Sequence, residues 1–500
     1  MGLGCGSGAD TTGNPPRRYA AAVRRKTKII ATLGPAVESA EAVSDLIEAG
    51  MNVARLNFSH GTYESHRRFC NWVREASERL DVPVAVLQDI QGPRIRVGTF
   101  PGGSVHLEQG SEVLLVRGEG EGDATHLCIE NLDGAALSVG DPIRISDGLI
   151  HLETVSADGE FVKARTVEGG IVHDHQGVAF PGVYIDVPVV TPKDERDLAF
   201  GAELGVDMVA ASFVGDGDDV RTVRRHIGSG VPIIAKIESA YGYRNLGDIL
   251  TEAYGAMVAR GDLGVELSFE AVPRAQKEIL TRTNAAARLS ITATEMLESM
   301  RTSPRPTRAE VTDVSSAVLD GADAVMLSAE TAIGKYPTRV VKAMARICQE
   351  AETSPDYGRG PEIEFLEDSA RFASATAQAC VDAATNLNLS AIVAFTESGS
   401  TARLISKYRP RAAIYAYTPE VSTYRRMALY AGVTPHMFER VRSTDEMIRH
   451  AERHLLAEGH VALGDGVVMA AGTPPNLRAS TNLMKLHSIG STLSGGPGEQ

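Results

Sequence analysis

The segment Ile233-Ile-Ala-Lys-Ile237 is a short run of mainly β-branched apolar residues, followed by the polar pair Glu238-Ser239. Similar runs alternate along residues 27–327 with segments that have the apolar spacing of helices, a pattern typical of parallel strands joined by crossover helices. The eight runs are Thr27 to Ala31, Asn52 to Leu56, Val84 to Gln88, Met208 to Phe213, Ile233 to Ile237, Ala256 to Arg260, Ile291 to Thr294 and Ala324 to Leu327. Eight strand and helix pairs close a (β/α)8 TIM barrel, whereas an open doubly wound sheet more often has about five or six strands. The sequence therefore predicts an α/β protein built on a closed barrel.

Two of the predicted helices have clear ends. Ser39 begins a helix that ends at Gly50, and Thr307-x-x-Glu310 is a capping box for a helix that ends before Gly321. Four apolar residues of the second helix share one face, which we assign to the core or to a subunit interface: Val311, Val314, Val318 and Leu319.

Two regions depart from the barrel pattern. Residues 97–190 are rich in Gly and Val, with a strand-like segment at Ser111 to Val116 and turn signals at Asp133-Gly134 and Asp147-Gly148. Because barrel enzymes place active-site loops after their strands, we expect this insert to be a lid. Strand-like segments of a third, α/β domain follow: Ile392 to Phe395, Ala413 to Tyr417 and Gly466 to Ala470. The predicted divisions are a flexible tail (1–24), a catalytic barrel (25–96 and 191–354), the insert (97–190), a C-terminal domain (355–490) and a disordered tail (491–500).

Charge and cysteine content exclude several classes of function. The 50 Lys and Arg against 64 Asp and Glu give a net charge of −14, which disfavours nucleic acid and anionic membrane surfaces as partners. The 5 cysteines are an odd number without a CxxC pair, which indicates inert thiols in a reducing cytoplasm rather than disulfides or a zinc site. The sequence contains no apolar run long enough to span a membrane. We therefore predict a cytoplasmic protein.

Polar residues stand where the predicted strands end. They are Arg55, Asn57 and Ser59 after the second run, Asp89 and Arg96 after the third, Lys236 and Glu238 at the fifth, Asp262 after the sixth and Thr294 at the seventh. The carboxyl ends of barrel strands meet at one mouth. Two of the carboxylates there suit Mg2+ or Mn2+, and Arg55, Arg96 and Lys236 suit phosphate or carboxylate. This combination favours phosphoryl transfer.

Each of these residues also has an ordinary structural explanation. Lys236 and Glu238 could form a plain surface ion pair, and residues 261–264 could be a simple turn. Thr294 is often only a strand-end residue, and His60 is more often a hydrogen-bonded filler than a base. The shared position at strand ends favours a catalytic site over these alternatives.

Several long segments resemble the pyruvate kinase family, and the resemblance runs from about Thr27 to about Ile489. They are Arg55 to Gly61, Lys236 to Ser239, Met257 to Glu266, Ala293 to Met300, Arg305 to Val314, Met326 to Pro337 and Thr396 to Pro410. The resemblance implies a barrel domain, a small β-barrel lid inserted after the third strand and a C-terminal regulatory domain. It also implies phosphoryl transfer from phosphoenolpyruvate to ADP, giving pyruvate and ATP, by a homotetramer.

The resemblance assigns roles to individual residues. Glu238 and Asp262 would bind the divalent metal that bridges the enolate oxygens and the phosphoryl group. Lys236 and Arg55 would bind the phosphoryl group in transfer. The backbone at Gly261 and Asp262 would bind the substrate carboxylate at a helix N-terminus, and Thr294 would lie near the carbon that is protonated.

The resemblance also implies a nucleotide site at Asn57 to His60 and Arg96, with a second Mg2+. Members of the family bind K+ through positions that correspond to Asn57, Ser59, Asp89 and Ile90, and many carry Glu where this chain has Arg94. Because a fixed guanidinium can supply the charge of K+, we expect activity without added K+. Gln176 and Ser146 replace a Lys and an Asp common in the family's lid, so the lid's contacts to nucleotide are left open.

The segment Thr396-Glu-Ser-Gly-Ser-Thr401 resembles the family's effector loop. Its hydroxyl groups and backbone N–H groups precede a helix, which suits a phosphate; the residues concerned are Thr396, Ser398, Gly399, Ser400 and Thr401. A capped helix without a ligand is the alternative. Glu397 adds negative charge, so we expect a monophosphorylated sugar or AMP rather than fructose 1,6-bisphosphate.

Two further functions stay open on the sequence alone. One is another Mg2+-dependent barrel enzyme acting on phosphoenolpyruvate or pyruvate, such as an aldolase or a dikinase-like phosphotransferase. The other is a catalytically silent metabolite sensor that uses only the C-terminal loop. The set Arg55, Lys236, Glu238, Asp262 and Thr294 argues against the sensor.

Overall fold

The computed structural model describes residues 25–491 apart from 131, 133–136, 159–160, 359–370, 442 and 473–479. The predicted tail 1–24, the predicted tail 491–500 apart from its first residue, and the predicted turn at Asp133-Gly134 lie outside the described residues. No helix within the described ranges combines the length and the apolar content needed to cross a bilayer.

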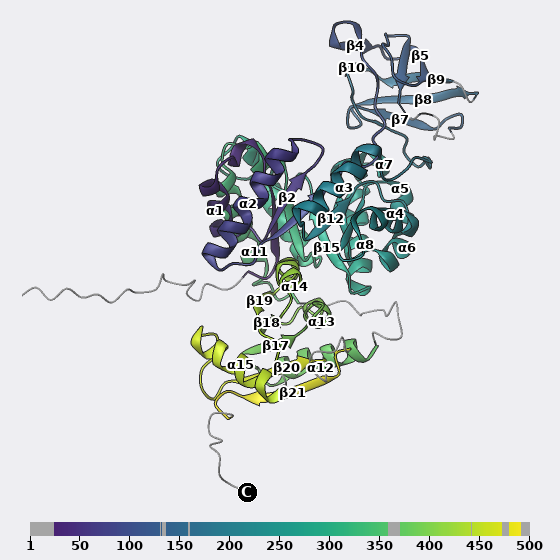
Figure 1. Ribbon diagram of the computed structural model, residues 1–500. Helices are drawn as coiled ribbons and strands as arrows, with labels where there is room; N and C mark the ends of the chain where they lie inside the picture. Colours follow the sequence, from purple (N-terminus) through teal and green to yellow (C-terminus); the bar gives the residue numbers. More distant parts are fainter. Residues whose placement is uncertain are drawn as a thin grey trace, which may run out of the picture.

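A closed barrel of eight parallel strands forms the centre of the molecule (Figure 1), in the order β1-β16-β15-β14-β13-β12-β3-β2. The strands are β1 (Lys28–Thr32), β2 (Val53–Asn57), β3 (Ala85–Asp89), β12 (Met208–Ala211), β13 (Ile233–Ile237), β14 (Gly255–Ala259), β15 (Leu289–Ala293) and β16 (Ala324–Leu327). These are the eight predicted runs. They are buried almost throughout, which explains why they are continuous apolar runs rather than alternating ones.

Three strands end before the residue predicted to be their last, at the carboxyl end of each. Phe213 and Thr294 have φ values of 55° and 67°, a left-handed conformation that an extended strand does not allow. Arg260 is the first residue of α7 rather than the last residue of β14. All three positions lie at the mouth of the barrel, where the chain turns sharply.

Helices surround the barrel. They are α1 (Ala40–Ala49), α2 (Tyr63–Leu80), α3 (Pro192–Leu204), α4 (Gly217–Ile227), α5 (Ala240–Arg244), α6 (Leu246–Glu252), α7 (Arg260–Leu267), α8 (Val272–Ala285), α9 (Arg308–Leu319), α10 (Ala329–Ala332) and α11 (Pro337–Ala351). The predicted helix ends are confirmed: Ser39 accepts the Ala42 amide, Gly50 is left-handed at φ 118°, and Thr307 and Glu310 form a capping box. Only two of the four apolar residues predicted to share one face of α9 are covered within one chain. Val314 and Val318 are buried, whereas Val311 and Leu319 are exposed.

The insert between β3 and β12 folds into a β domain at one end of the barrel (Figure 1). Its strands are β4 (Ser104–Leu107), β5 (Glu112–Arg117), β6 (His126–Ile129), β7 (Pro142–Ile145), β8 (Ile150–Ala157), β9 (Phe161–Glu168), β10 (Gly170–His173) and β11 (Val178–Ala179). Six form a curled sheet in the order β11-β7-β8-β9-β5-β6, and β10 pairs with β4. The predicted turn at Asp147-Gly148 joins β7 to β8, with both residues left-handed.

The C-terminal domain lies at the opposite end of the barrel (Figure 1). It contains α12 (Arg371–Asn386), β17 (Ala391–Phe395), α13 (Ser400–Lys407), β18 (Ala413–Thr418), α14 (Val421–Arg426), β19 (Val433–Met437), α15 (Thr444–Ala457), β20 (Gly466–Ala471) and β21 (Leu483–Ser488). The sheet order is β19-β18-β17-β20-β21, with β21 antiparallel. The sequence predicted β17, β18 and β20 but not the two edge strands.

The C-terminal domain and the barrel share one hydrophobic core. Inward-facing barrel residues such as Ile30 and Met326 belong to the same buried cluster as Ile405 and Tyr430 of the C-terminal domain. A buried charge cluster, which we call the floor cluster, lies at this junction and consists of Asp323, Lys407 and Arg409. Lys407 pairs with Asp323 and also donates to Asn284 Oδ1 at 2.7 Å, while an Arg409 Nη atom lies 2.7 Å from Asp323 Oδ1.

Candidate active site

Four charged residues at the carboxyl ends of β2, β3 and β13 form a chain of ion pairs at the barrel mouth. Arg55 Nε lies 2.7 Å from Asp89 Oδ2, and Lys236 Nζ lies 3.4 Å from Asp89 Oδ1 and 2.9 Å from Glu238 Oε1. All four residues are more than nine-tenths buried. The alternative of a surface ion pair at Lys236 and Glu238 is therefore wrong. We call these four residues the mouth cluster.

The mouth cluster keeps Lys236 charged. Burial opposes the charge on Lys236, but Asp89 and Glu238 outweigh it and raise the pKa of the ammonium above its usual value. Burial likewise opposes ionisation of Asp89, yet Arg55 and Lys236 hold the pKa of that carboxyl below its usual value. The result is a fixed positive charge on Lys236 in a dry environment, where a charge acts more strongly on a bound anion than in water.

Glu238, unlike Lys236, lies in an environment that opposes its charge. Burial raises the pKa of its carboxyl, and although Lys236 counteracts this, the charge of Asp262 raises it further. One carboxylate oxygen also accepts the Phe213 amide at 2.7 Å. A carboxylate that is destabilised by burial and by a second carboxylate is stabilised by an added cation.

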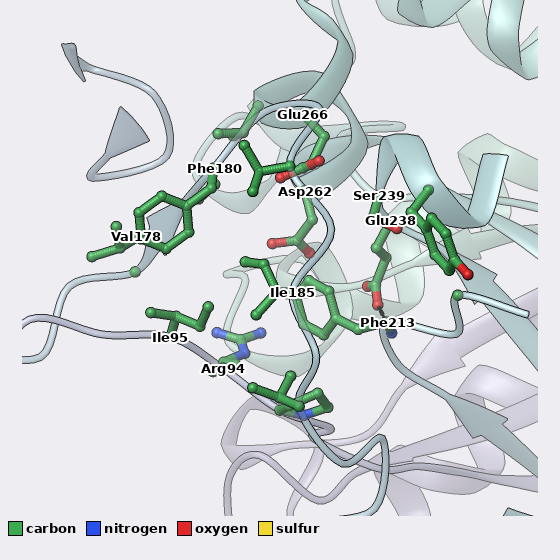
Figure 2. A pocket seen from close by; sticks show the side chains of 18 of the residues that line it. Arg94, Ile95, Val178, Phe180, Ile185, Phe213, Glu238, Ser239, Asp262 and Glu266 are labelled. Atoms are coloured by element: carbon green, nitrogen blue, oxygen red, sulfur yellow. Dashed lines mark hydrogen bonds between the residues drawn. The ribbon is translucent and has the colours of Figure 1, made fainter. Parts of the chain in front are cut away.

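Asp262 lies in the first turn of α7. Residues 261–264 are therefore helical, and their interpretation as a simple turn is wrong. Asp262 and Glu238 line the same pocket of about 360 Å3. Figure 2 shows these two carboxyl groups and the guanidinium of Arg94 around that pocket.

Thr294 lies beside the start of α7. Its Oγ1 accepts the Gly261 amide at 3.0 Å and donates to the Ala293 carbonyl at 2.6 Å. Arg260 fixes this turn, since its Nε donates to the Thr294 carbonyl at 3.1 Å and its guanidinium pairs with Asp313 at 2.7 Å. The backbone of Thr294 is left-handed, with φ 67°. This conformation is costly for a non-glycine residue and is frequent at functional sites. The contacts thus join Thr294 to Gly261.

The pocket lies between the barrel mouth and the two segments that connect the insert to the barrel. Arg94 and Arg96 line it from the outgoing segment, and Tyr184 and Ile185 line it from the returning one. Burial lowers the pKa of Arg96, and the neighbouring Arg94 lowers it further. Two basic residues therefore line the same pocket as the two carboxylates.

Other predicted residues of the mouth lie at its edge. The Asn57 side chain accepts the Ser59 amide at 3.2 Å, and the Ile90 carbonyl accepts the Ser212 hydroxyl at 2.8 Å. His60 is exposed, and its backbone carbonyl contacts the His66 ring at 3.0 Å. The His60 side chain is not joined to the mouth cluster by any contact among the described residues.

The predicted effector loop lies between β17 and α13. Thr396 Oγ1 accepts the Gly399 amide at 2.9 Å, and the hydroxyl groups of Ser398 and Ser400 lie 3.0 Å apart. Thr401 is buried, and its hydroxyl bonds to that of Thr481 at 2.7 Å. Ser398 is exposed and Ser400 is half-buried, so these two hydroxyl groups are the ones open to a ligand.

Sequence reasoning missed three residues that hold the mouth cluster in place. Lys236 donates to Ser212 Oγ at 2.7 Å, Phe213 donates its amide to Glu238, and Arg55 donates to Thr32 Oγ1 at 2.9 Å. Ser212 and Thr32 are polar residues at strand ends, the same signal that identified the others. Phe213 contributes only backbone, so no sequence pattern could have identified it.

The donor set fits a hard divalent cation. No group of three or more His, Cys, Asp or Glu side chains within the described ranges has the arrangement of a metal site. Two carboxylates are nevertheless sufficient for Mg2+, which commonly takes its remaining oxygen ligands from water and phosphate. Both carboxylates line one pocket, and the raised pKa of Glu238 marks a site at which added positive charge is favourable.

Comparison with known proteins decides the family. A profile described as "Pyruvate kinase, barrel domain" matches residues 24–341, and one described as "Pyruvate kinase, alpha/beta domain" matches residues 374–487. The chain belongs to the pyruvate kinase family. The pyruvate kinases of Staphylococcus aureus strains USA300 and bovine RF122 / ET3-1 are each 42% identical to it over 483 residues, which cover 95% of this chain and 82% of the relative.

Membership of the pyruvate kinase family makes the chain a phosphotransferase. The barrel, the inserted sheet domain and the C-terminal α/β domain have the organisation of this family. The resemblance noted from the sequence is therefore confirmed, and the alternatives of another barrel enzyme and of a silent sensor are not supported.

Proposed function

We propose that this chain transfers the phosphoryl group of phosphoenolpyruvate to ADP, giving pyruvate and ATP, at the mouth of its barrel. The observation that carries the proposal is the buried, charged Lys236 beside Glu238, which lines one pocket with Asp262. Phosphoryl transfer needs positioned positive charge more than covalent chemistry. The mouth cluster supplies that charge on rigid strand ends.

Glu238 and Asp262 would hold one divalent metal, Mg2+ or Mn2+, and a second would arrive with the nucleotide. When bound, the metal supplies a Lewis acid that polarises the substrate's oxygens. Glu238 is already oriented for this role, because Lys236 holds one of its oxygens and the Phe213 amide holds the other.

Lys236 and Arg55 would bind the phosphoryl group as it moves. The ammonium of Lys236 is held between Asp89, Glu238 and Ser212, so its charge is oriented before the substrate arrives. Charge that is fixed in advance avoids reorganisation at the moment of transfer.

Gly261, Asp262 and Thr294 would bind the rest of the substrate. The N-terminus of α7 offers backbone N–H groups to the substrate carboxylate, and the Thr294 hydroxyl now accepts the Gly261 amide. That hydroxyl would lie near the carbon that is protonated to give pyruvate, with the proton delivered through water.

The nucleotide would contact Asn57, His60 and Arg96, with residues 97–190 as a lid. Arg96 lines the pocket at the base of the insert and His60 is exposed beside the mouth. Gln176 is bonded within the insert, where its side chain accepts the His173 amide at 3.0 Å.

We further propose that the enzyme works without added K+, because Arg94 supplies the positive charge. The oxygens that would bind the ion at Asn57, Asp89 and Ile90 are each hydrogen-bonded or ion-paired within the chain. The test is the initial rate in K+-free buffer. We expect a full rate, and an increase of about tenfold or more on adding K+ would contradict the proposal.

The loop from Thr396 to Thr401 is proposed as a phosphate site for an allosteric effector, a monophosphorylated sugar or AMP. In support, Arg440 is occupied by Glu397 at 2.6 Å and by Glu420, so a second phosphate would have to break two ion pairs. Calorimetric titration with both classes of ligand tests this. Tight binding of a bisphosphate without binding of a monophosphate would refute it.

A homotetramer and a cytoplasmic location complete the proposal. Val311 and Leu319 are exposed apolar residues on α9, which supports a subunit interface there. The four described cysteines are free, which suits a reducing compartment. Sedimentation analysis of the intact chain measures the oligomeric state.

The experiment that tests the proposed reaction is a coupled assay. Phosphoenolpyruvate, ADP and Mg2+ are supplied with lactate dehydrogenase, and NADH oxidation reports the pyruvate formed. We expect turnover that depends on ADP and that stops when the metal is chelated. Metal-replete protein without ADP-dependent turnover would refute the reaction.

A further inference from the structure

Two tyrosines join the segment that returns from the insert to the metal-binding face of the barrel. Tyr184 lies between β11 and α3, and its ring centroid is 4.5 Å from that of Tyr241, with an interplanar angle of 51°. Tyr241 belongs to α5, which begins two residues after Glu238. Both tyrosines line the pocket.

The Tyr241 ring packs closely against the barrel. A Cβ atom added at Gly215 would lie 2.8 Å from Tyr241 Cδ1, so the ring packs directly against the Gly215 backbone. The Gly215 amide in turn donates to Asp219 Oδ2 at 2.7 Å. The returning segment therefore rests on a side chain that the barrel holds in one position.

Glu266 makes a second connection between the same parts. It lies one helical turn after Asp262 on α7, and Ala240 at the start of α5 donates its amide to Glu266 Oε2 at 3.3 Å. The Gly182 amide, in the returning segment, also hydrogen-bonds to this carboxylate. Gly182 has φ +80°, a conformation that glycine adopts without strain.

We infer that Tyr184, Tyr241 and Glu266 are positioning residues that fasten the lid's returning segment to α5 and α7, the two elements beside the metal ligands. The inference rests on the proposed function of the same site. Because α5 begins two residues after Glu238 and α7 carries Asp262, the returning segment keeps a fixed position relative to both ligands, from which the lid can close. Loop and domain closure of this kind completes a catalytic site and excludes water.

The fastening predicts a particular kinetic signature. Tyr184→Ala and Tyr241→Ala should each raise the KM for ADP and the half-saturating Mg2+ concentration by about 3- to 10-fold, which is the effect expected from the loss of one aromatic pair. The value of kcat should change by less than about twofold, because the population of the closed lid changes and not the chemistry. The double variant should be no worse than either single variant, since either one breaks the contact.

Matched controls come from the same helix and the same positions. Tyr243 also lies on α5, but its hydroxyl bonds to Glu278 at 2.5 Å, away from the lid, so Tyr243→Ala should leave both constants within about twofold of wild type. Tyr184→Phe and Tyr241→Phe retain the rings and should restore wild-type values. Glu266→Gln retains an acceptor oxygen and should match wild type, whereas Glu266→Ala should match Tyr241→Ala.

A readout independent of activity separates this inference from the proposed reaction. Amide hydrogen exchange over residues 181–187 should increase several-fold in Tyr241→Ala and remain at the wild-type rate in Tyr243→Ala. An inactive wild-type protein would refute the reaction, and exchange alone would then decide the fastening. Unchanged exchange in Tyr241→Ala, or effects of the two alanine variants that multiply in the double variant, would overturn the inference.

Discussion

A buried lysine lies at each end of the barrel, Lys236 on a barrel strand and Lys407 on α13 of the C-terminal domain, and the two lysines differ in the charges around them. At the mouth, Lys236 contacts two carboxylates, and the pKa of its ammonium is raised despite burial. At the floor, Lys407 shares the single carboxylate of Asp323 with Arg409, and burial lowers the pKa of Lys407 to about 7. Similar residue types thus form two different electrostatic environments.

The two clusters differ in whether the protein itself encloses them or leaves them open to a ligand. The mouth cluster opens through Glu238 onto a pocket that Asp262 and Arg94 also line. The floor cluster is closed by the C-terminal domain, and Asp323 and Lys407 are fully buried. Barrel enzymes carry their chemistry at the carboxyl ends of the strands and stability at the amino ends. A charged cluster in a barrel is therefore a candidate site when a ligand, rather than the protein, has to complete it.

The largest predicted effect is on catalysis at the mouth. Lys236→Met should lower kcat by at least about 1,000-fold, because it removes a fixed charge that acts on the transferred group. Lys407→Met, the matched variant at the floor, should retain kcat within about threefold. The coupled assay and circular dichroism measure activity and fold. Equal losses of kcat in the two folded variants would contradict the division of roles.

The second effect is on stability at the floor. Asp323→Ala leaves Lys407 and Arg409 buried without their carboxylate, which should cost about 3–5 kcal/mol in the free energy of unfolding. The activity of each folded molecule should remain near wild type. Urea denaturation followed by fluorescence measures the loss, and a change below about 1 kcal/mol would show that the floor cluster does not hold the two domains together.

The third effect is a pH dependence. The pKa of Lys407 is about 7 in the folded chain, below its usual 10.5, so between these values the unfolded chain binds a proton that the folded chain lacks. This contribution to the free energy of unfolding therefore increases with pH from about 7 to about 10. Lys407→Met removes it, so wild type should gain stability relative to the variant across this window. If the free energies of unfolding of wild type and Lys407→Met, plotted against pH, ran parallel across this window, the result would contradict the lowered pKa of Lys407.

The smallest effect is at a residue that supports Lys236. Ser212 accepts a hydrogen bond from Lys236 at 2.7 Å and donates one to Ile90. Ser212→Ala should lower kcat about tenfold, the low end for a hydrogen bond to a charged group, because the two carboxylates still hold the ammonium. Ser212→Thr retains the hydroxyl and should recover most of the rate. A loss as large as that of Lys236→Met would mean that Ser212 acts on the substrate directly.

Much of the fold could be predicted because the barrel strands are buried on both faces and therefore stand out as apolar runs. The edge strands β19 and β21 could not, since Thr434-Pro435-His436 interrupts one and Lys485 and His487 interrupt the other. Edge strands face water on one side and tolerate such residues.

The candidate site was predictable where strand ends carry its side chains. Arg55, Asp89, Lys236 and Glu238 are joined by direct contacts, as their positions indicated. The fastening residues Tyr184 and Glu266 were missed, because their partners depend on how the insert lies against the barrel. The left-handed turns at Phe213 and Thr294 were missed because tertiary contacts, and not local preference, impose them.

The measurement that tests the central claim most directly is anomalous diffraction from crystals of the intact enzyme with Mn2+ and phosphoenolpyruvate. The account predicts a manganese peak within about 2–2.3 Å of one oxygen from Glu238 and one from Asp262, the range for hard cations with oxygen ligands. A peak that contacts only one of these carboxylates, or neither, would contradict the account.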